Sequence, residues 1–270
     1  MSSERVTRIG LRTVALGYLF ALLFVPVGIV LYKTFEPGLG NVWASITTPA
    51  AIHAFWLTIM VTAIAVPLNT ALGILAALVL VRGRIRGKPL LDALIDLPFA
   101  VSPIVVGLSL VLVYGANGWF GGALTNAGIQ VIFSWPGIVL ATIFVTLPFV
   151  VRSVQPVLIE LDRDMEEAAA SLGAGGWTTF RRIVLPNLGP AIISGCALAF
   201  ARAVGEFGSI VLISGNIPFQ TQVASVFVFK QIESDAPITA AAVSVVLLVL
   251  SLGVLLAIRG VGSWGSRHEL

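Results

Sequence analysis

Long apolar runs separated by short polar segments dominate the chain. Six of these runs are long enough to cross a bilayer as helices, which takes about 20 apolar residues each. They cover residues 13–32, 55–81, 93–114, 137–158, 187–213 and 237–258. Because backbone groups in lipid must bond within their own segment, we predict an all-α membrane protein with six transmembrane helices. Prolines inside the runs, among them Pro98, Pro103 and Pro148, predict kinks.

Composition points to lipid as the main solvent. Of the 270 residues, 57% are hydrophobic and 11% are charged, whereas a soluble domain carries about 25% charged residues. The polar segments are all short, so we expect one transmembrane domain over residues 1–270. The first run follows a basic head and could be a cleaved signal peptide, but it continues through Leu31 without a small-residue cleavage site. We therefore predict an uncleaved first span.

The distribution of basic residues predicts the orientation. Thirteen of the 16 Lys and Arg residues would lie on the side of the N-terminus, two (Lys33 and Lys230) on the other side, and Arg202 within a span. Cytoplasmic segments normally carry the excess, so we expect both termini in the cytoplasm and the protein in the cytoplasmic (inner) membrane. The thirteen are Arg5, Arg8, Arg12, Arg82, Arg84, Arg86, Lys88, Arg152, Arg163, Arg181, Arg182, Arg259 and Arg267.

The polar segment 162–186 predicts two short helices joined by a glycine turn. Acidic residues crowd its first turn and a half, where negative charge suits a helix N-terminus, and alanines follow. Gly173 stands where a left-handed cap is expected. Apolar residues then recur at every third position from Trp177 to Ile183, which indicates a second helix. Pro186 restarts the chain toward the fifth span.

This segment resembles the cytoplasmic coupling loop of ABC importer permeases, with the pattern EAA, three residues, a glycine, then a bulky apolar residue and LP. The resemblance implies that the helix near Glu167–Leu172 docks in a groove of a separate ATPase. An ordinary amphipathic loop between two spans is the alternative. The residues that the resemblance assigns to coupling or to the motif are Glu167, Ala168, Ala169, Leu172, Gly173, Phe180, Leu185 and Pro186.

Two further stretches narrow the resemblance. Residues 93–121, ALIDLPFAVSPIVVGLSLVLVYGANGWFG, look like the third-span region of sulfate/thiosulfate importer permeases. Residues 201–222, ARAVGEFGSIVLISGNIPFQTQ, are also typical of them, although molybdate and tungstate permeases share the ARA-GEFG element. The likeness runs from about Arg12 to Ile258 and is closest to the W-type subunit, while the NIP element also resembles the T-type partner.

The family resemblance implies the type I ABC importer permease fold and a non-catalytic transport subunit for sulfate or thiosulfate. The implied partners are a second homologous permease subunit, two copies of an ABC ATPase subunit, an extracytoplasmic sulfate-binding protein and the lipid bilayer, with no nucleic acid. A molybdate/tungstate importer permease is one alternative. A membrane assembly subunit without a transport role is the alternative from a different class.

Signatures of an active site are missing from the sequence. There is no GxxxxGK(S/T) phosphate-binding loop, so ATP hydrolysis would belong to a partner chain. His53 and His268 would lie on opposite sides of the membrane, and no HExxH or CxxC motif occurs, so no metal site is expected. Cys196 is the only cysteine and cannot form an internal disulfide. We expect no cofactor.

Arg202 and Glu206 form the one ionic pair predicted inside a span. They are four residues apart, so on a continuous helix they share a face. Charges within a membrane usually face the bundle interior or a water-filled cavity, which makes the pair a candidate pathway or gate element. A structural salt bridge that locks helix packing explains the pattern equally well. Asp96, near the cytoplasmic end of the third span, is expected at the water interface.

Residues 214–236 form an outer segment whose middle is too short to span and too apolar to be free. We expect it to dip into the outer interface or to fold over the mouth of a pathway. A surface loop with a few aromatic residues is the alternative.

Overall fold

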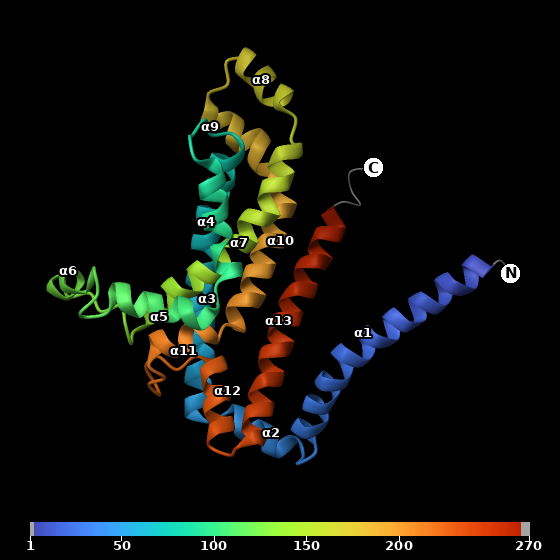
Figure 1. Cartoon of the computed structure of the whole chain (residues 1–270), viewed down its shortest axis with the longest axis vertical. Coiled ribbons are helices and arrows are strands. Elements are labelled where there is room, and N and C mark those ends of the chain that lie inside the picture. Colours follow the sequence, from blue (N-terminus) through green and yellow to red (C-terminus); the bar gives the residue numbers. More distant parts are fainter. Residues whose placement is uncertain (1–2, 266–270) are drawn as a thin grey trace.

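The computed structural model describes residues 3–265, and the regular elements within this range are helices (Figure 1). In chain order they are α1 (Ser3–Phe35), α2 (Leu39–Ile46), α3 (Pro49–Val81), α4 (Lys88–Ala100), α5 (Pro103–Tyr114), α6 (Gly121–Asn126), α7 (Trp135–Glu160), α8 (Arg163–Ser171), α9 (Gly176–Thr179), the π-helical turn η1 (Phe180–Val184), α10 (Leu185–Val204), α11 (Gly208–Ser214), α12 (Ala224–Glu233) and α13 (Pro237–Gly265). Arg267 and His268 lie outside the described residues.

Five described helices are long and apolar enough to cross a membrane, or six if the bent pair α4 and α5 counts as one span. Of these, α7 is the most enclosed, with 61% of its most apolar window buried. It packs against both α3 and α10, and these three helices form the centre of the bundle. Small residues allow the close approach, because a Cβ on Gly73 of α3 would lie 2.7 Å from Val150 of α7.

A buried amide adds a polar contact between α3 and α7. The Asn69 side chain donates to Thr146 Oγ1 at 2.6 Å and to the Ile143 carbonyl at 3.2 Å. Both side chains are fully buried. Buried polar groups need partners, and these two bonds give the Asn69 amide nitrogen its partners and join α3 to α7.

The predicted third span, residues 93–114, is not one kinked helix. It divides into α4 and α5, whose axes meet at 113°. Pro103 disfavours helical backbone at the residue before it, and Val101 and Ser102 are accordingly extended, with ψ of 137° and 134°. The break turns α5 and α6 sideways from the bundle (Figure 1). There α5 packs against α11, and a Cβ on Gly107 would lie only 2.5 Å from the Ser209 carbonyl oxygen.

The fifth predicted span, residues 187–213, also differs from the structure at both ends. Pro186 does not separate two helices, because it falls in the first turn of α10, directly after the π-helical turn η1. The helical path runs on from Gly176 through η1 to Val204. At the far end α10 stops at Val204, and α11 begins as a separate helix at Gly208.

The remaining helices flank this centre. Helix α1 stands away from the bundle and touches it near α2 and α13 (Figure 1), and none of its most apolar window is buried. Helix α12, from the outer segment predicted at 214–236, packs on α3 and α13 and buries Val226 and Phe227. The Ala224 N–H donates to Thr58 Oγ1 at 2.8 Å. This segment is therefore folded against the bundle rather than free.

Candidate functional site

The segment 162–186 projects beyond the bundle at the end where α3 stops and α10 begins (Figure 1). Its first helix, α8, starts at a capped N-terminus, because the Asp162 carboxylate accepts the Asp164 N–H at 3.0 Å. Asp164 and Glu166 occupy the first turn, where the partial positive charge of the helix N-terminus stabilises their negative charge. No α8 residue is buried, so local capping rather than a core holds the helix in shape.

Gly173 ends α8 in the predicted left-handed conformation, with φ of 83°. Its N–H donates to the Ala170 carbonyl at 2.9 Å, and the Ala174 N–H donates to the Ala169 carbonyl at 3.0 Å. These two bonds form a Schellman motif, which satisfies carbonyls left without partners at the helix end. A Cβ added to Gly173 would meet nothing within 4 Å, so conformation, not space within this chain, requires glycine here.

The residues predicted for coupling fall on two sides of the segment. Four of them, Glu167, Ala168, Leu172 and Gly173, are exposed. Leu172 has 89% of its surface exposed. Ala169 and Phe180 are half-buried. Phe180 packs against the core and stacks on Trp177 with ring centres 5.6 Å apart. The first four therefore form an exposed tip.

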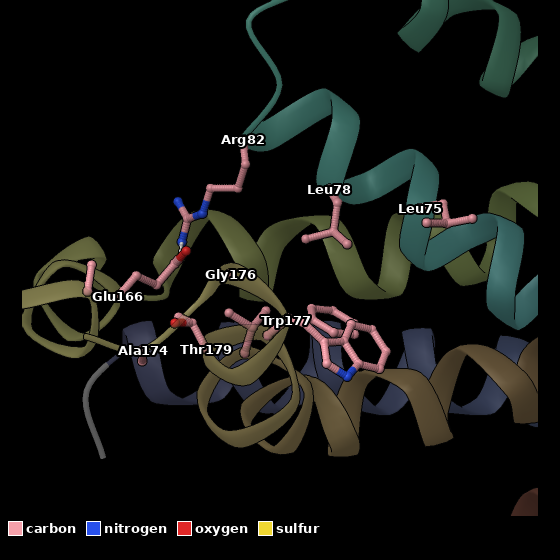
Figure 2. Close-up of a pocket in the computed structure, with 11 residues that line it drawn as sticks. Leu75, Leu78, Arg82, Glu166, Ala174, Gly176, Trp177 and Thr179 are labelled. Atoms are coloured by element: carbon pink, nitrogen blue, oxygen red, sulfur yellow. Dashed lines mark ion pairs between the residues drawn. The ribbon is translucent and has the colours of Figure 1, made fainter. Parts of the chain in front are cut away.

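An ion pair that the sequence did not reveal fixes the inner side of α8. Arg82, directly after α3, places its Nη2 2.7 Å from Glu166 Oε1 and donates from the same nitrogen to the Leu161 carbonyl at 3.0 Å. A pocket of about 610 Å³ lies beside this pair, between α3 and the segment α8–α9 (Figure 2). In the sequence, Arg82 is only one of the basic residues that indicate orientation, because nothing local connects it to Glu166.

Glu206 and Arg202 do form an ion pair, but not on one helix. Since α10 ends at Val204, Glu206 lies in the break before α11. Its side chain is fully buried, and Oε1 accepts the Ser209 N–H at 2.9 Å and the Ser209 hydroxyl at 2.8 Å. Glu206 thus stabilises the start of α11, where a negative charge and a hydrogen-bond acceptor are both favourable.

The surroundings of this pair distinguish its two members. Glu206 faces a closed space with no room for water, lined by residues that include Thr58, Thr62 and Val223. The Arg202 side chain keeps 33% of its surface exposed. The Ser225 hydroxyl also donates to the Glu206 carbonyl at 2.5 Å, which ties the break to α12. Arg202 is therefore the more exposed member of the pair.

A second ionic cluster joins α7 to α4. Arg152 binds both carboxylate oxygens of Asp96, at 2.8 and 2.5 Å, and Asp92 Oδ1 at 2.8 Å. Gln155 accepts a further bond from the same guanidinium at 2.5 Å. Asp96, expected at the water interface, is thus a partner of Arg152. The spacing of Asp92 and Asp96 by one helical turn was the available signal, since it places both carboxylates on one face of α4.

A family model described as "Binding-protein-dependent transport system inner membrane component" matches residues 69–259. This range contains the central helices α7 and α10, the α8 tip and the break at Glu206. The chain belongs to this family. Its members are inner-membrane components of transport systems, which agrees with the apolar helices described above.

Named relatives are similar over nearly the whole chain. The chain is 45% identical to the probable sulfate transport system permease protein cysT of Nephroselmis olivacea, covering 90% of this chain and 86% of that protein. It is 43% identical to the sulfate transport system permease protein CysT of Synechococcus elongatus, with 93% and 91% covered. The CysW protein of the same organism is 42% identical, with 92% and 89% covered. These similar values do not separate the two subunit types.

Solved structures support the fold. The chain matches a bacterial ABC transporter involved in the import of the acidic polysaccharide alginate with a TM-score of 0.77, 18% identity and 99% of both chains covered. It matches an inward-facing MetNI methionine ABC transporter with a TM-score of 0.56, 15% identity, and 80% of this chain and 94% of that one covered. The predicted all-α fold of the type I ABC importer permeases is confirmed.

Proposed function

We propose that this protein is a transmembrane permease subunit of an ATP-driven importer for sulfate or thiosulfate. The observation that carries the proposal is 45% identity, over 90% of the chain, to a protein named as a sulfate transport permease. The exposed tip of α8 supports it, because the tip offers a contact surface for a separate ATPase. The chain itself is a non-catalytic transport subunit.

Four partner chains complete the proposed machine. A second homologous permease supplies the other half of the pathway, two ATPase copies bind the α8 tips, and an extracytoplasmic sulfate-binding protein delivers the anion. Closure of the ATPases would move each α8 and convert the permease pair between inward-open and outward-open arrangements by rigid-body rotation. A related alginate importer has been solved with its periplasmic binding protein, which supports this assembly by analogy.

The orientation of the chain in the membrane is also a proposal. The end of the bundle that carries α8 is the basic end, where Arg82, Arg84, Arg181 and Arg182 lie, and it would face the cytoplasm. Both termini would lie on the same side. The end formed by α2 and α12 would face outward, where the binding protein docks.

Arg202 is the proposed pathway residue, with Glu206 as its partner. A permanently charged guanidinium can attract a dianion, and the buried Glu206 carboxylate offsets that charge so that the anion is not trapped. Glu206→Gln should slow uptake while the complex still assembles, and Arg202→Gln should slow it more. If the pair is only structural, the double variant Arg202→Gln/Glu206→Gln recovers assembly and full uptake together, and that recovery would refute a pathway role.

Reconstitution of the complex tests the proposed function. The four kinds of chain are co-expressed, purified through a tag on this permease, and placed in liposomes. ATP is supplied either inside or outside the liposomes, and only ATP on the ATPase side should drive uptake. Uptake of radiolabelled sulfate is then measured with excess thiosulfate or molybdate as competitor. Competition by thiosulfate supports the proposal. Uptake of molybdate in preference to sulfate would overturn the anion assignment, and a complex without ATPase would favour an assembly subunit.

A further inference from the structure

We propose that Arg82 and Glu166 form a strut through which α8 acts on α3, with Arg82 as a positioning residue for transport. The Arg82–Glu166 strut rests on the proposed docking of the α8 tip to an ATPase and adds the route by which that movement reaches the membrane bundle. Its basis is the ion pair at 2.7 Å between the end of α3 and the first turn of α8.

Two consecutive glutamates on α8 have different surroundings. Glu166 is partly buried, with 27% of its side chain exposed, and pairs with Arg82. Glu167 is exposed, since successive residues on a helix point about 100° apart. The geometry therefore divides the acidic pair: Glu166 anchors α8 to its own chain, and Glu167 remains available to a partner.

The chain connections of α8 explain why an anchor to α3 matters. Helix α8 follows α7 after Leu161 and Asp162, and it leads to α9 and α10 through residues 172–175. The third central helix, α3, has no such connection to α8. Arg82 supplies it, and because the same guanidinium donates to the Leu161 carbonyl at 3.0 Å, it also holds the junction of α7 and α8.

A pocket beside the Arg82–Glu166 strut lies between α3 and α8. Leu75 and Leu78 of α3 line one side of the 610 Å³ space, and Glu166 with Trp177 lines the other (Figure 2). This space separates α8 from the apolar face of α3, and the ion pair bridges the two helices across it. Farther along the segment, η1 shares an apolar cluster with α3 through Val184 and Ala77. The Arg82 guanidinium is held by the charge of Glu166 and by its hydrogen bond to the Leu161 carbonyl.

The consequence is a defined uncoupling. With the strut intact, α3 follows α8 when the ATPases close. Without it, α8 still follows the ATPase through the tip, but α3 lags behind, so ATP is hydrolysed with less anion moved. The measurable quantity is the amount of sulfate transported per ATP hydrolysed, which a loss of overall stability would not change selectively.

The experiment uses the complete complex in proteoliposomes with radiolabelled sulfate. For Arg82→Gln and for Glu166→Gln we expect normal ATPase content and ATP hydrolysis within about twofold of the unmodified complex. The amount of sulfate transported per ATP hydrolysed should fall at least about fivefold, which is the lower end of typical coupling effects. The charge-exchanged double variant Arg82→Glu/Glu166→Arg should recover part of the ratio, because it restores the ion pair but not the bond to the Leu161 carbonyl. Arg82→Lys should be intermediate, because the shorter lysine side chain keeps the charge but places its ammonium less well for contact with both Glu166 and the Leu161 carbonyl. Glu160→Gln, an exposed carboxylate at the end of α7, is the matched control and should leave the ratio unchanged.

Three results would overturn the strut. An unchanged ratio in both single variants would show that the pair transmits nothing. Loss of ATPase from the Glu166→Gln complex would make Glu166 a docking residue instead. Equal loss in the single and the charge-exchanged variants would show that pairing is not what matters. Failure of the proposed function looks different, because the unmodified complex would then lack ATPase or sulfate uptake.

Discussion

Substitution of Gly173 separates the shape of the coupling segment from the contacts it makes. The residue has φ of 83°, a region that costs other L-residues about 1–2 kcal/mol. Gly173→Ala should therefore lower the population of the capped α8 by a factor of about 5–30. Gly173→Asn should cost less, because asparagine enters this region more readily. Gly173→Pro cannot adopt it at all and also removes the bond to the Ala170 carbonyl.

The surroundings of Gly173 show how to interpret a loss of transport larger than backbone strain alone would cause. No atom of this chain lies within 4 Å of an added Cβ, so strain is the only penalty inside the permease. Because α8 buries none of its residues, that strain should leave the bundle intact. If Gly173→Asn loses as much transport as Gly173→Ala, the added bulk must clash with a partner. Gly173→Asp adds a charge at the same place and should abolish uptake.

The assay is the initial rate of sulfate uptake per assembled complex, with ATPase content measured on the same sample. We expect normal membrane insertion for all four variants, the mildest loss for Gly173→Asn, and no uptake for Gly173→Pro and Gly173→Asp. Gly253→Ala, at a helical glycine where a Cβ also meets nothing within 4 Å, is the control for an added methyl group. Normal uptake by an assembled Gly173→Asp complex would show that the segment is an ordinary surface loop.

Three further outcomes are expected. Reporters fused after Arg84 or Gly176 should read cytoplasmic and those after Gly122 or Gln231 external, and the reverse pattern would refute both orientation and docking. Gly107→Ala should lower the melting temperature, because its Cβ would lie 2.5 Å from the Ser209 carbonyl oxygen and such overpacking costs about 1–3 kcal/mol; an unchanged melting temperature would mean that α5 and α11 move apart freely. Asn69→Leu should cost about 0.6–2 kcal/mol by removing the bond to Thr146, and adding Thr146→Val should cost little more if the two side chains act as a pair.

The coupling segment could be predicted in detail because its determinants are local. The cap of α8 depends on Asp162 and the residues just after it, and the turn depends on the freedom of Gly173 to adopt positive φ. Both features are properties of the nearest few residues. The path after the turn was less predictable, since Pro186 is compatible both with a new helix and with the first turn of a continuing one.

The ion pairs escaped prediction for the opposite reason. Arg82 with Glu166, and Arg152 with Asp96, join residues on different helices, and only the packing of α3, α4 and α7 brings them together. The hydrophobic pattern predicts that those helices exist, but it does not predict which of their faces meet. The same limit applies to the angle between α4 and α5. Pro103 predicts a break in the helix, but the angle of 113° between α4 and α5 cannot be read from the sequence, because α5 also packs against α11.

The break before α11 shows how one buried charge can serve two purposes. Four-residue spacing predicted that Arg202 and Glu206 share a helix, yet the chain leaves the helix between them, and the two side chains still meet. In the break, Glu206 is free to accept both bonds from Ser209 and so begins α11, which in turn supports α5 through Gly107. Removing the carboxylate would therefore disturb the α5–α11 unit as well as the charge next to Arg202. A pathway role can be separated from this structural role only by variants that keep the acceptor and change the charge, and Glu206→Gln is the substitution that does so.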